Sequence, residues 1–139
     1  MNVYEIAEIR NRLQSSFPKA YVNMQFEIII YPPRNSYFRL SSVETEEELN
    51  AKILEWLSRE ASKSLSRASQ KYHLDGINKF LGTSFTQDDM IKIYTYLGNA
   101  INHDLTIEFI RGGYDLKVID AAVAARGAAY ELGNLYAGN

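Results

Sequence analysis

The chain has 139 residues, of which 46% are hydrophobic and 23% are charged, a composition typical of a soluble globular domain. It carries 15 Lys and Arg residues against 17 Asp and Glu, so its formal net charge of −2 excludes nucleic-acid or membrane binding through overall charge. The absence of cysteine excludes disulfides, thiol nucleophiles and thiolate metal sites, and fits a protein of the reducing cytoplasm.

The first residues predict a helix over residues 3–16. Ile6, Ile9 and Leu13 recur at helical spacing, and Pro18 ends the pattern. This segment lacks the apolar run of a secretory signal, so we predict no signal peptide. No apolar run approaches the length of a membrane span.

From residue 22 the hydrophobic period changes to two, which predicts one long strand over residues 22–31. The prolines at 32–33 end it, a turn follows at 34–35, and residues 36–40 complete an antiparallel hairpin. We expect two helices to cover the face formed by Met24, Phe26, Ile28 and Ile30. We expect a partner or a second copy to dock on the other face, unless the chain covers it; that face bears Tyr21, Ile29, Tyr31 and Tyr37.

The next helix is predicted to open with a capping box between Thr45 and Glu48. Residues 58–69 hold five serines and read as the one linker-like stretch of the chain. We therefore expect a lobe of residues 1–62 and a lobe of residues 63–139 that share a core.

The second lobe is predicted to be helical throughout. One helix ends before Gly82, the next opens with a capping box between Thr86 and Asp89, and a short helix covers residues 105–111. The glycines at 112–113 supply a turn, Asp115 caps the last helix, and the alanine-rich end is expected to fray or to pack against a partner. The order predicts an α+β fold: an α-β-β-α unit whose two helices cover the hairpin, followed by three to four helices.

No catalytic motif emerges from the sequence. The two histidines lie in no metal or triad pattern, and no serine stands in a nucleophile motif. Asp104 is best explained as a helix N-cap. The sequence therefore favours a non-catalytic protein without metal or cofactor, and a metal-dependent enzyme centred on His103, Asp104 and Glu108 is the alternative.

A second alternative is a nucleic-acid-binding regulator. Residues 63–81 hold four basic residues and one acidic residue, between acidic neighbours, and the basic residues are Lys63, Arg67, Lys71 and Lys79. The hairpin adds Tyr31, Arg34, Tyr37 and Arg39, an arrangement loosely similar to the double-stranded-RNA-binding domain. That family opens its second helix with lysines, whereas this chain has glutamates at 46–48.

The ordered segments EIAEIRNRLQSSFPKAYVN, FEIIIYPPRNSYFRL, EEELNAKILEWLSR, FLGTSFTQDDMIKIYTYLGN and LTIEFIRGGYDLKVI resemble a family of small uncharacterised proteins encoded by phages and prophages of Gram-positive bacteria. The resemblance covers residues 3–119. It implies an accessory phage protein that acts in the host cytoplasm, a class that includes stoichiometric inhibitors of host defences such as CRISPR effector nucleases. It assigns no functional residue.

We therefore predict a non-catalytic protein that binds a host or phage macromolecule. Ten tyrosines fit an interaction surface, because tyrosine supplies rigid contact area with a hydrogen-bonding end. Acidic residues at 44, 46–48 and 88–89 would mimic nucleic-acid phosphate in an inhibitor. The predicted partner-binding residues are Tyr31, Arg34, Tyr37, Arg39, Glu46, Glu47 and Glu48, and a homo-oligomer through the hairpin stays open.

Overall fold

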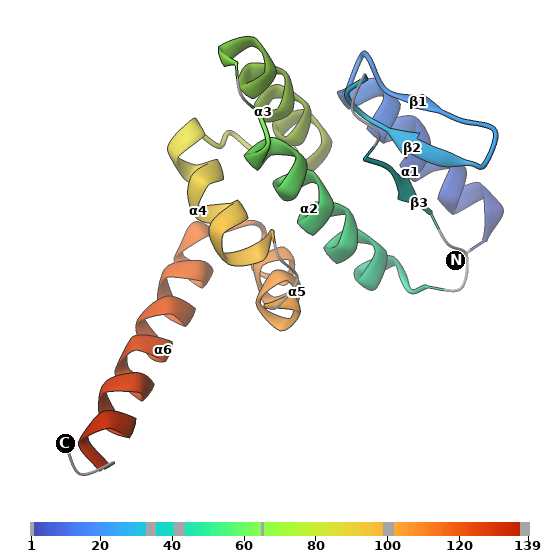
Figure 1. The fold of residues 1–139 in the computed structure, drawn as a ribbon. Coiled ribbons are helices and arrows are strands. Elements are labelled where there is room, and N and C mark those ends of the chain that lie inside the picture. Colours follow the sequence, from blue (N-terminus) through green and yellow to red (C-terminus); the bar gives the residue numbers. More distant parts are fainter. Residues whose placement is uncertain (1, 33–35, 41–43, 65, 99–101, 137–139) are drawn as a thin grey trace.

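In the computed structural model, a helix and a small sheet precede a series of packed helices (Figure 1). The structure describes residues 2–32, 36–40, 44–64, 66–98 and 102–136, the side chains as far as residue 127. The described elements are α1 (Val3–Ser16), β1 (Tyr21–Val22), β2 (Glu27–Ile29), β3 (Phe38–Arg39), α2 (Glu46–Ser62), α3 (Arg67–Leu81), α4 (Gln87–Leu97), α5 (His103–Arg111) and α6 (Leu116–Tyr136). This order confirms the predicted α+β class.

The sheet has three antiparallel strands in the order β1-β2-β3, so the prediction of one strand over residues 22–31 is wrong. A tight turn interrupts it because the Asn23 side-chain oxygen accepts hydrogen bonds from the backbone N–H groups of Gln25 and Glu27, each at 3.0 Å. Met24 and Phe26 therefore lie on this turn and are 92% and 69% exposed, not buried as predicted.

One hydrophobic cluster joins the sheet to the helices on both sides of residue 62. Ile28 and Ile30 are buried in it as predicted, and the helices contribute Leu13, Leu49, Leu57, Ile77, Ile93, Phe109 and Ile119. Helix α2 occupies the middle, in contact with α3, α4 and α5, while Figure 1 shows α1 behind the sheet. The burial of these side chains is the main favourable contribution to folding.

The serine-rich stretch 58–69 is not a linker. It contains the end of α2 and the start of α3, and both Ser58 and Ser69 are buried. The Ser58 hydroxyl donates to the carbonyl of Leu54 at 2.7 Å, which satisfies it inside the helix.

Two of the predicted helix caps form and a third forms in part. The Thr86 and Asp89 box is complete, and the Asp115 carboxylate accepts from the N–H of Lys117 at 3.0 Å. The Thr45 hydroxyl accepts from the N–H of Glu48 at 3.2 Å, but the Glu48 carboxylate binds His103, so the predicted box is only half formed. Asp104 is not a cap, because α5 begins one residue earlier.

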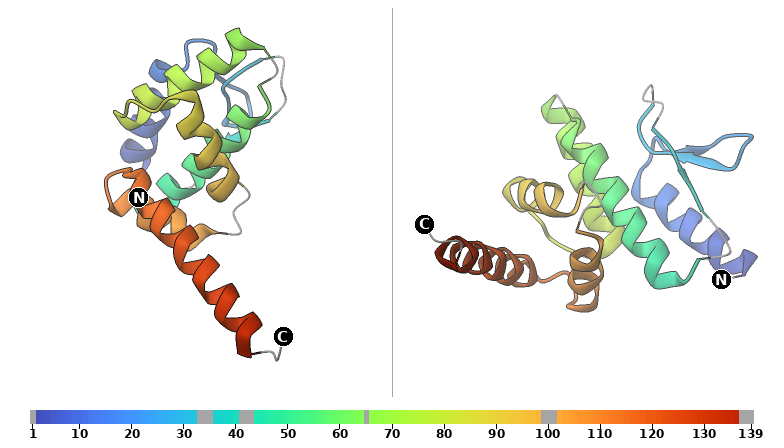
Figure 2. Two further views of the ribbon diagram at one scale, coloured as in Figure 1. Left: turned by 90° about the vertical axis from the view of Figure 1, so that its left-hand side faces the viewer. Right: turned by 60° about the horizontal axis from the view of Figure 1, so that its bottom comes forward.

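Helix α6 projects away from the rest of the molecule (Figures 1 and 2). Its first turns pack on α4 and α5 through Leu116, Ile119 and Val123, and Lys92 forms an ion pair with Asp120 at 2.8 Å. The helix continues to Tyr136, and the expectation that its end frays or packs against a partner stays a prediction.

Candidate interaction surface

The pleat of the sheet separates a core face from an open face. Val22, Ile28 and Phe38 are paired across the strands and face the core. On the other side Tyr21 lies opposite Ile29, and Glu27 lies opposite Arg39. We call this side, made of Tyr21, Glu27, Ile29, Tyr37 and Arg39, the outer face.

The outer face is open where its aromatic side chains lie. Tyr21 is 45% exposed and Tyr37 is 53% exposed, while Ile29 beside them is buried. The Arg39 side chain is 60% exposed and forms an ion pair with Glu27, Nη2 to Oε2, at 3.2 Å. An apolar surface with two phenol groups and one neutralised ion pair is typical of a protein interface.

The structure places only part of the predicted hairpin site on this face. Tyr37 and Arg39 belong to it. Tyr31 is half-buried, with its ring centroid 5.1 Å from that of Tyr72 and the Lys19 ammonium 5.2 Å above it, so it does not lie on the open face as predicted. Arg34 lies outside the described residues.

The predicted acidic site is largely occupied by the chain's own cations. Glu47 accepts two hydrogen bonds from Arg111, at 2.9 and 2.6 Å, and these bonds lower the pKa of Glu47. Glu48 binds His103, and Glu44 binds Lys52 at 2.6 Å. Because cationic side chains of the same chain balance the charges of these carboxylates, they are poor mimics of phosphate. Glu46 is the acidic residue of this helical turn that is exposed.

The basic side chains of the alternative nucleic-acid site are exposed, yet three of them have partners. Lys71 pairs with Asp75 at 2.7 Å, Lys63 pairs with Glu60 at 3.4 Å, and Lys79 donates to the Ser15 carbonyl at 3.1 Å. Arg67 is exposed at the first residue of α3.

His103 forms a polar bridge from α5 to two carboxylates of α2. Its Nδ1 lies 2.7 Å from Oε1 of Glu55, and its Nε2 lies 2.8 Å from Oε2 of Glu48. Two carboxylate partners require both ring nitrogens to donate, so the ring is held as an imidazolium. The hydrogen bond to Glu55, foremost, raises the pKa of His103.

The sequence does not predict this bridge, because Glu55 and Glu48 lie 48 and 55 residues from His103 along the chain. The one local signal was Glu55 within the apolar run of α2, where the carboxylate is buried.

The structure does not bring together His103, Asp104 and Glu108, the three residues of the alternative metal-dependent enzyme. Both nitrogens of His103 face Glu48 and Glu55, while Asp104 and Glu108 line a separate hollow of about 360 Å³ with Ile107 and Arg111. Across the described ranges, no three His, Asp or Glu side chains are placed to share a metal ion.

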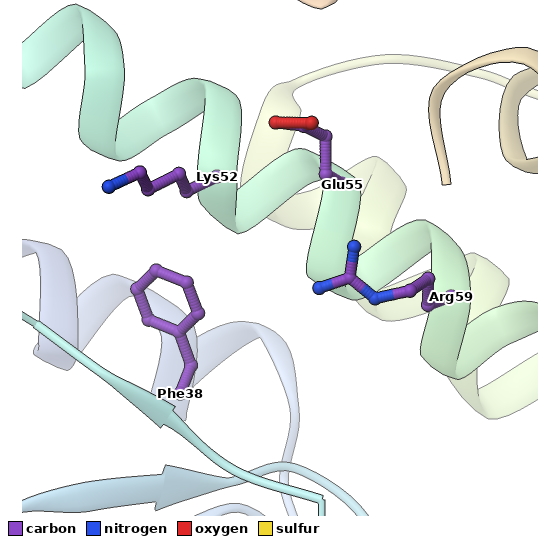
Figure 3. Close-up of a pocket in the computed structure, with 4 residues that line it drawn as sticks. All are labelled: Phe38, Lys52, Glu55 and Arg59. Atoms are coloured by element: carbon purple, nitrogen blue, oxygen red, sulfur yellow. The ribbon is translucent and has the colours of Figure 1, made fainter. Parts of the chain in front are cut away.

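A second hollow, of about 170 Å³, lies between β3 and α2 (Figure 3). Phe38 rises into it from the strand, and Lys52, Glu55 and Arg59 line it from the helix. The charges are already bound, Lys52 by Glu44, Glu55 by His103 and Arg59 by the Gly98 carbonyl at 3.1 Å. These contacts hold α2 against neighbouring parts of the chain, and they indicate no catalytic role for the four lining residues.

His73 is a core residue. It is fully buried, and its Nδ1 lies 2.8 Å from the Ser69 carbonyl and 2.9 Å from the Ser64 hydroxyl. A bond to a carbonyl requires a proton on Nδ1, so this nitrogen cannot take the proton of Ser64.

No protein-family model, no curated protein and no solved structure matches this chain. In the part that the structure describes, none of the helices combines the length and the apolar character that a bilayer crossing requires.

Proposed function

We propose that this chain is a non-catalytic protein that binds another protein through the outer face of its sheet. The observation that carries the proposal is the exposure of Tyr21 and Tyr37 on one face, beside the neutralised Arg39 and Glu27 pair. Tyrosine is enriched at interfaces because it buries a large rigid ring at low entropic cost and keeps a hydrogen-bonding hydroxyl.

Charge supports this face over the acidic turn of α2. Desolvating a paired Glu27 and Arg39 on binding costs less than desolvating free charges. The carboxylates of Glu47 and Glu48, in contrast, would have to leave Arg111 and His103 before they could bind a partner's cations.

The family resemblance gives the proposal a biological setting. We place the chain among accessory proteins of phages and prophages, acting on a host or phage protein. A stoichiometric inhibitor of a host-defence nuclease, such as a CRISPR effector, is its concrete form, and that inhibitor would act by covering a surface and not by phosphate mimicry.

The test is capture of partners from a nuclease-treated host lysate, followed by affinity measurement with the purified partner. We expect the double variant Tyr21→Ser/Tyr37→Ser to weaken binding at least tenfold, because each exposed ring supplies contact area that serine lacks. Ile91→Ser is the matched control, since Ile91 is a 45% exposed apolar residue on α4. Equal affinity for the double variant and the wild type would contradict the proposal.

The nucleic-acid alternative gives a different result in the same experiment. Retention would be lost on nuclease treatment, and the logarithm of the binding constant would fall linearly with the logarithm of salt concentration. Replacing Arg67 and Lys71 by Gln would then reduce that slope, while the tyrosine variant would bind normally.

A further inference from the structure

Glu48 stands where the sequence predicts the second half of a capping box, but its carboxylate binds another group. The Thr45 hydroxyl accepts from the N–H of Glu48 at 3.2 Å, which is the first half of the motif. In the second half the Glu48 carboxylate would accept from the N–H of Thr45, whereas in the structure it lies 2.8 Å from Nε2 of His103. Two groups therefore compete for one carboxylate.

The same motif at the start of α4 shows the complete form of the box. The Thr86 hydroxyl accepts from the N–H of Asp89 at 3.2 Å, and the Thr86 N–H donates to the Asp89 carboxylate at 2.9 Å. Glu48 occupies the position in α2 that Asp89 occupies in α4, and it differs by its contact with His103.

The two carboxylates that hold the His103 ring differ in their freedom to move. The Glu55 side chain is 3% exposed and the Glu48 side chain is 42% exposed. A neutral imidazole keeps one N–H group and one lone pair, so it can donate to only one of them. Loss of the Nδ1 proton would leave the buried Glu55 side chain without its hydrogen bond, which is the more costly outcome. The proton therefore leaves from Nε2, and its lone pair then repels the Glu48 oxygen.

Other charged groups around the ring are bound to one another. Among the described residues, Glu48 and Glu55 are the charged groups in contact with the ring, and Lys52 and Arg59 flank Glu55 along α2 (Figure 3). The pairs on α2 and on the helices packed against α5 are Lys52 with Glu44, Arg59 with the Gly98 carbonyl, Lys92 with Asp120, and Arg111 with Glu47. On α5 itself, Asp104 and Glu108 line the separate hollow.

We propose that Glu48 is a proton-controlled switch between two partners. When His103 carries both ring protons, the Glu48 carboxylate binds its Nε2. When the ring is neutral, the carboxylate turns back and closes the capping box by accepting from the N–H of Thr45. The Nε2 proton passes to solvent and the Nδ1 proton stays on the bond to Glu55. The switch belongs to this chain alone and does not depend on the proposed function.

The exchange is local and occurs on the alkaline side of an ordinary histidine. The hydrogen bond to Glu55, foremost, and that to Glu48 raise the pKa of His103. Helix α5 stays in place in both states, because Leu105 and Phe109 are buried and Arg111 pairs with Glu47. The start of α2 therefore loses the positive charge beside it without unfolding of α5.

The test is a pH titration of the full chain, followed by nuclear magnetic resonance. From pH 6 to pH 9 we expect the ring nitrogen shifts of His103 to report loss of the Nε2 proton and retention of the Nδ1 proton. With the same midpoint, the Thr45 amide proton should move downfield. Its protection against hydrogen exchange should rise roughly fivefold, because one hydrogen bond contributes about 1 kcal/mol. The Thr86 amide, in its complete box, is the control in the same sample and should not move.

The variant Glu48→Ala removes the carboxylate from both states and should fold, because Glu48 is only half-buried. We expect it to lower the pKa of His103 relative to the wild type and to abolish the pH-dependent shift of Thr45. A Thr45 amide that stays still while His103 titrates, or one that still shifts in Glu48→Ala, would overturn the switch. So would a neutral ring that carries its proton on Nε2, or a ring that keeps both protons up to pH 9.

Discussion

Phe26 and Tyr114 show how the same backbone strain can serve two ends. Both residues have φ of +62°, but Tyr114 packs on the core, and burial raises the pKa of its hydroxyl. Phe26 is mostly exposed, and its positive φ closes the turn between β1 and β2, where its N–H donates to the Asn23 carbonyl at 3.1 Å. The same backbone conformation therefore serves core packing at one position and a hairpin turn at the other.

We expect Phe26→Gly to leave the free energy of unfolding unchanged or to raise it by up to about 1 kcal/mol, because glycine adopts positive φ without strain. The measurement is urea denaturation. Tyr114→Gly is the control and should lose about 2–3 kcal/mol, since it removes a ring from the core. A loss above about 1 kcal/mol for Phe26→Gly would show that the Phe26 side chain itself stabilises the fold.

His103 makes stability depend on pH in one direction. In the folded state its pKa is raised above the ordinary value of a histidine, chiefly by the hydrogen bond to Glu55. The bridge therefore makes its full contribution to the free energy of unfolding at pH values below the pKa of His103 in the unfolded chain. That contribution is lost as the pH rises through the pKa of His103 in the folded protein. Above that pKa the imidazole ring of His103 no longer offers a positive charge to the buried Glu55 side chain.

We expect His103→Gln to lower the free energy of unfolding by about 2 kcal/mol at pH 6, because hydrogen bonds to charged groups contribute about 1.5–3 kcal/mol. The difference between wild type and variant should shrink from pH 6 to pH 9, as measured by urea denaturation at each pH. A difference that stays constant across this range would contradict the charged bridge.

At the scale of elements, α1 and α3 approach so closely that only glycine fits between them. A Cβ atom on Gly76 would lie 2.1 Å from Cε1 of Phe17, whose ring is fully buried. Glycine lowers helix propensity by about 1 kcal/mol relative to alanine, so its presence in the middle of α3 needs this contact as an explanation.

We expect Gly76→Ala to lower the free energy of unfolding by about 1–3 kcal/mol, because the added methyl group would force the fully buried Phe17 ring to shift. Gly127→Ala is the matched control in α6, where an added Cβ meets nothing within 4 Å, and it should be neutral or slightly stabilising. Thermal denaturation of both variants and of the wild type measures these changes in stability. A stabilised Gly76→Ala protein would show that the helices pack less closely than described.

The elements that local patterns specify were predictable. Residues 3–16 form α1 as the apolar spacing predicts, and Thr86 with Asp89 caps α4 as their three-residue spacing predicts. The prediction of one strand over residues 22–31 was wrong because the alternation of apolar residues continues through the turn. Only the side chain of Asn23 indicates that the chain reverses there. The prediction of a linker at residues 58–69 was wrong because a serine in a helix can satisfy its hydroxyl on its own backbone.

At the scale of the whole molecule, the sequence predicts the outer face but not the turn that ends it. Alternation along the hairpin separates Tyr21 and Tyr37 from the core residues, which the exposures confirm. The same alternation assigned Met24 and Phe26 to the core, since it carries no information on the turn. The contact of His103 with Glu55 depends on the packing of α5 against α2, which no local pattern encodes.

The molecule as a whole joins a helical body to a sheet with one open face. Helix α2 fixes that arrangement, because it packs against α3, α4 and α5 and its Trp56 ring lies 5.4 Å from Phe38 of β3. A packed helical body behind an exposed aromatic face is suited to binding with little rearrangement.

The dissociation constant of the purified partner, measured by calorimetry for the wild type, for Tyr21→Ser/Tyr37→Ser and for Ile91→Ser, tests the role of the outer face most directly. We expect the tyrosine variant to raise the constant at least tenfold and the Ile91 control to leave it unchanged. Equal constants for all three correctly folded proteins would show that the outer face does not bind the partner.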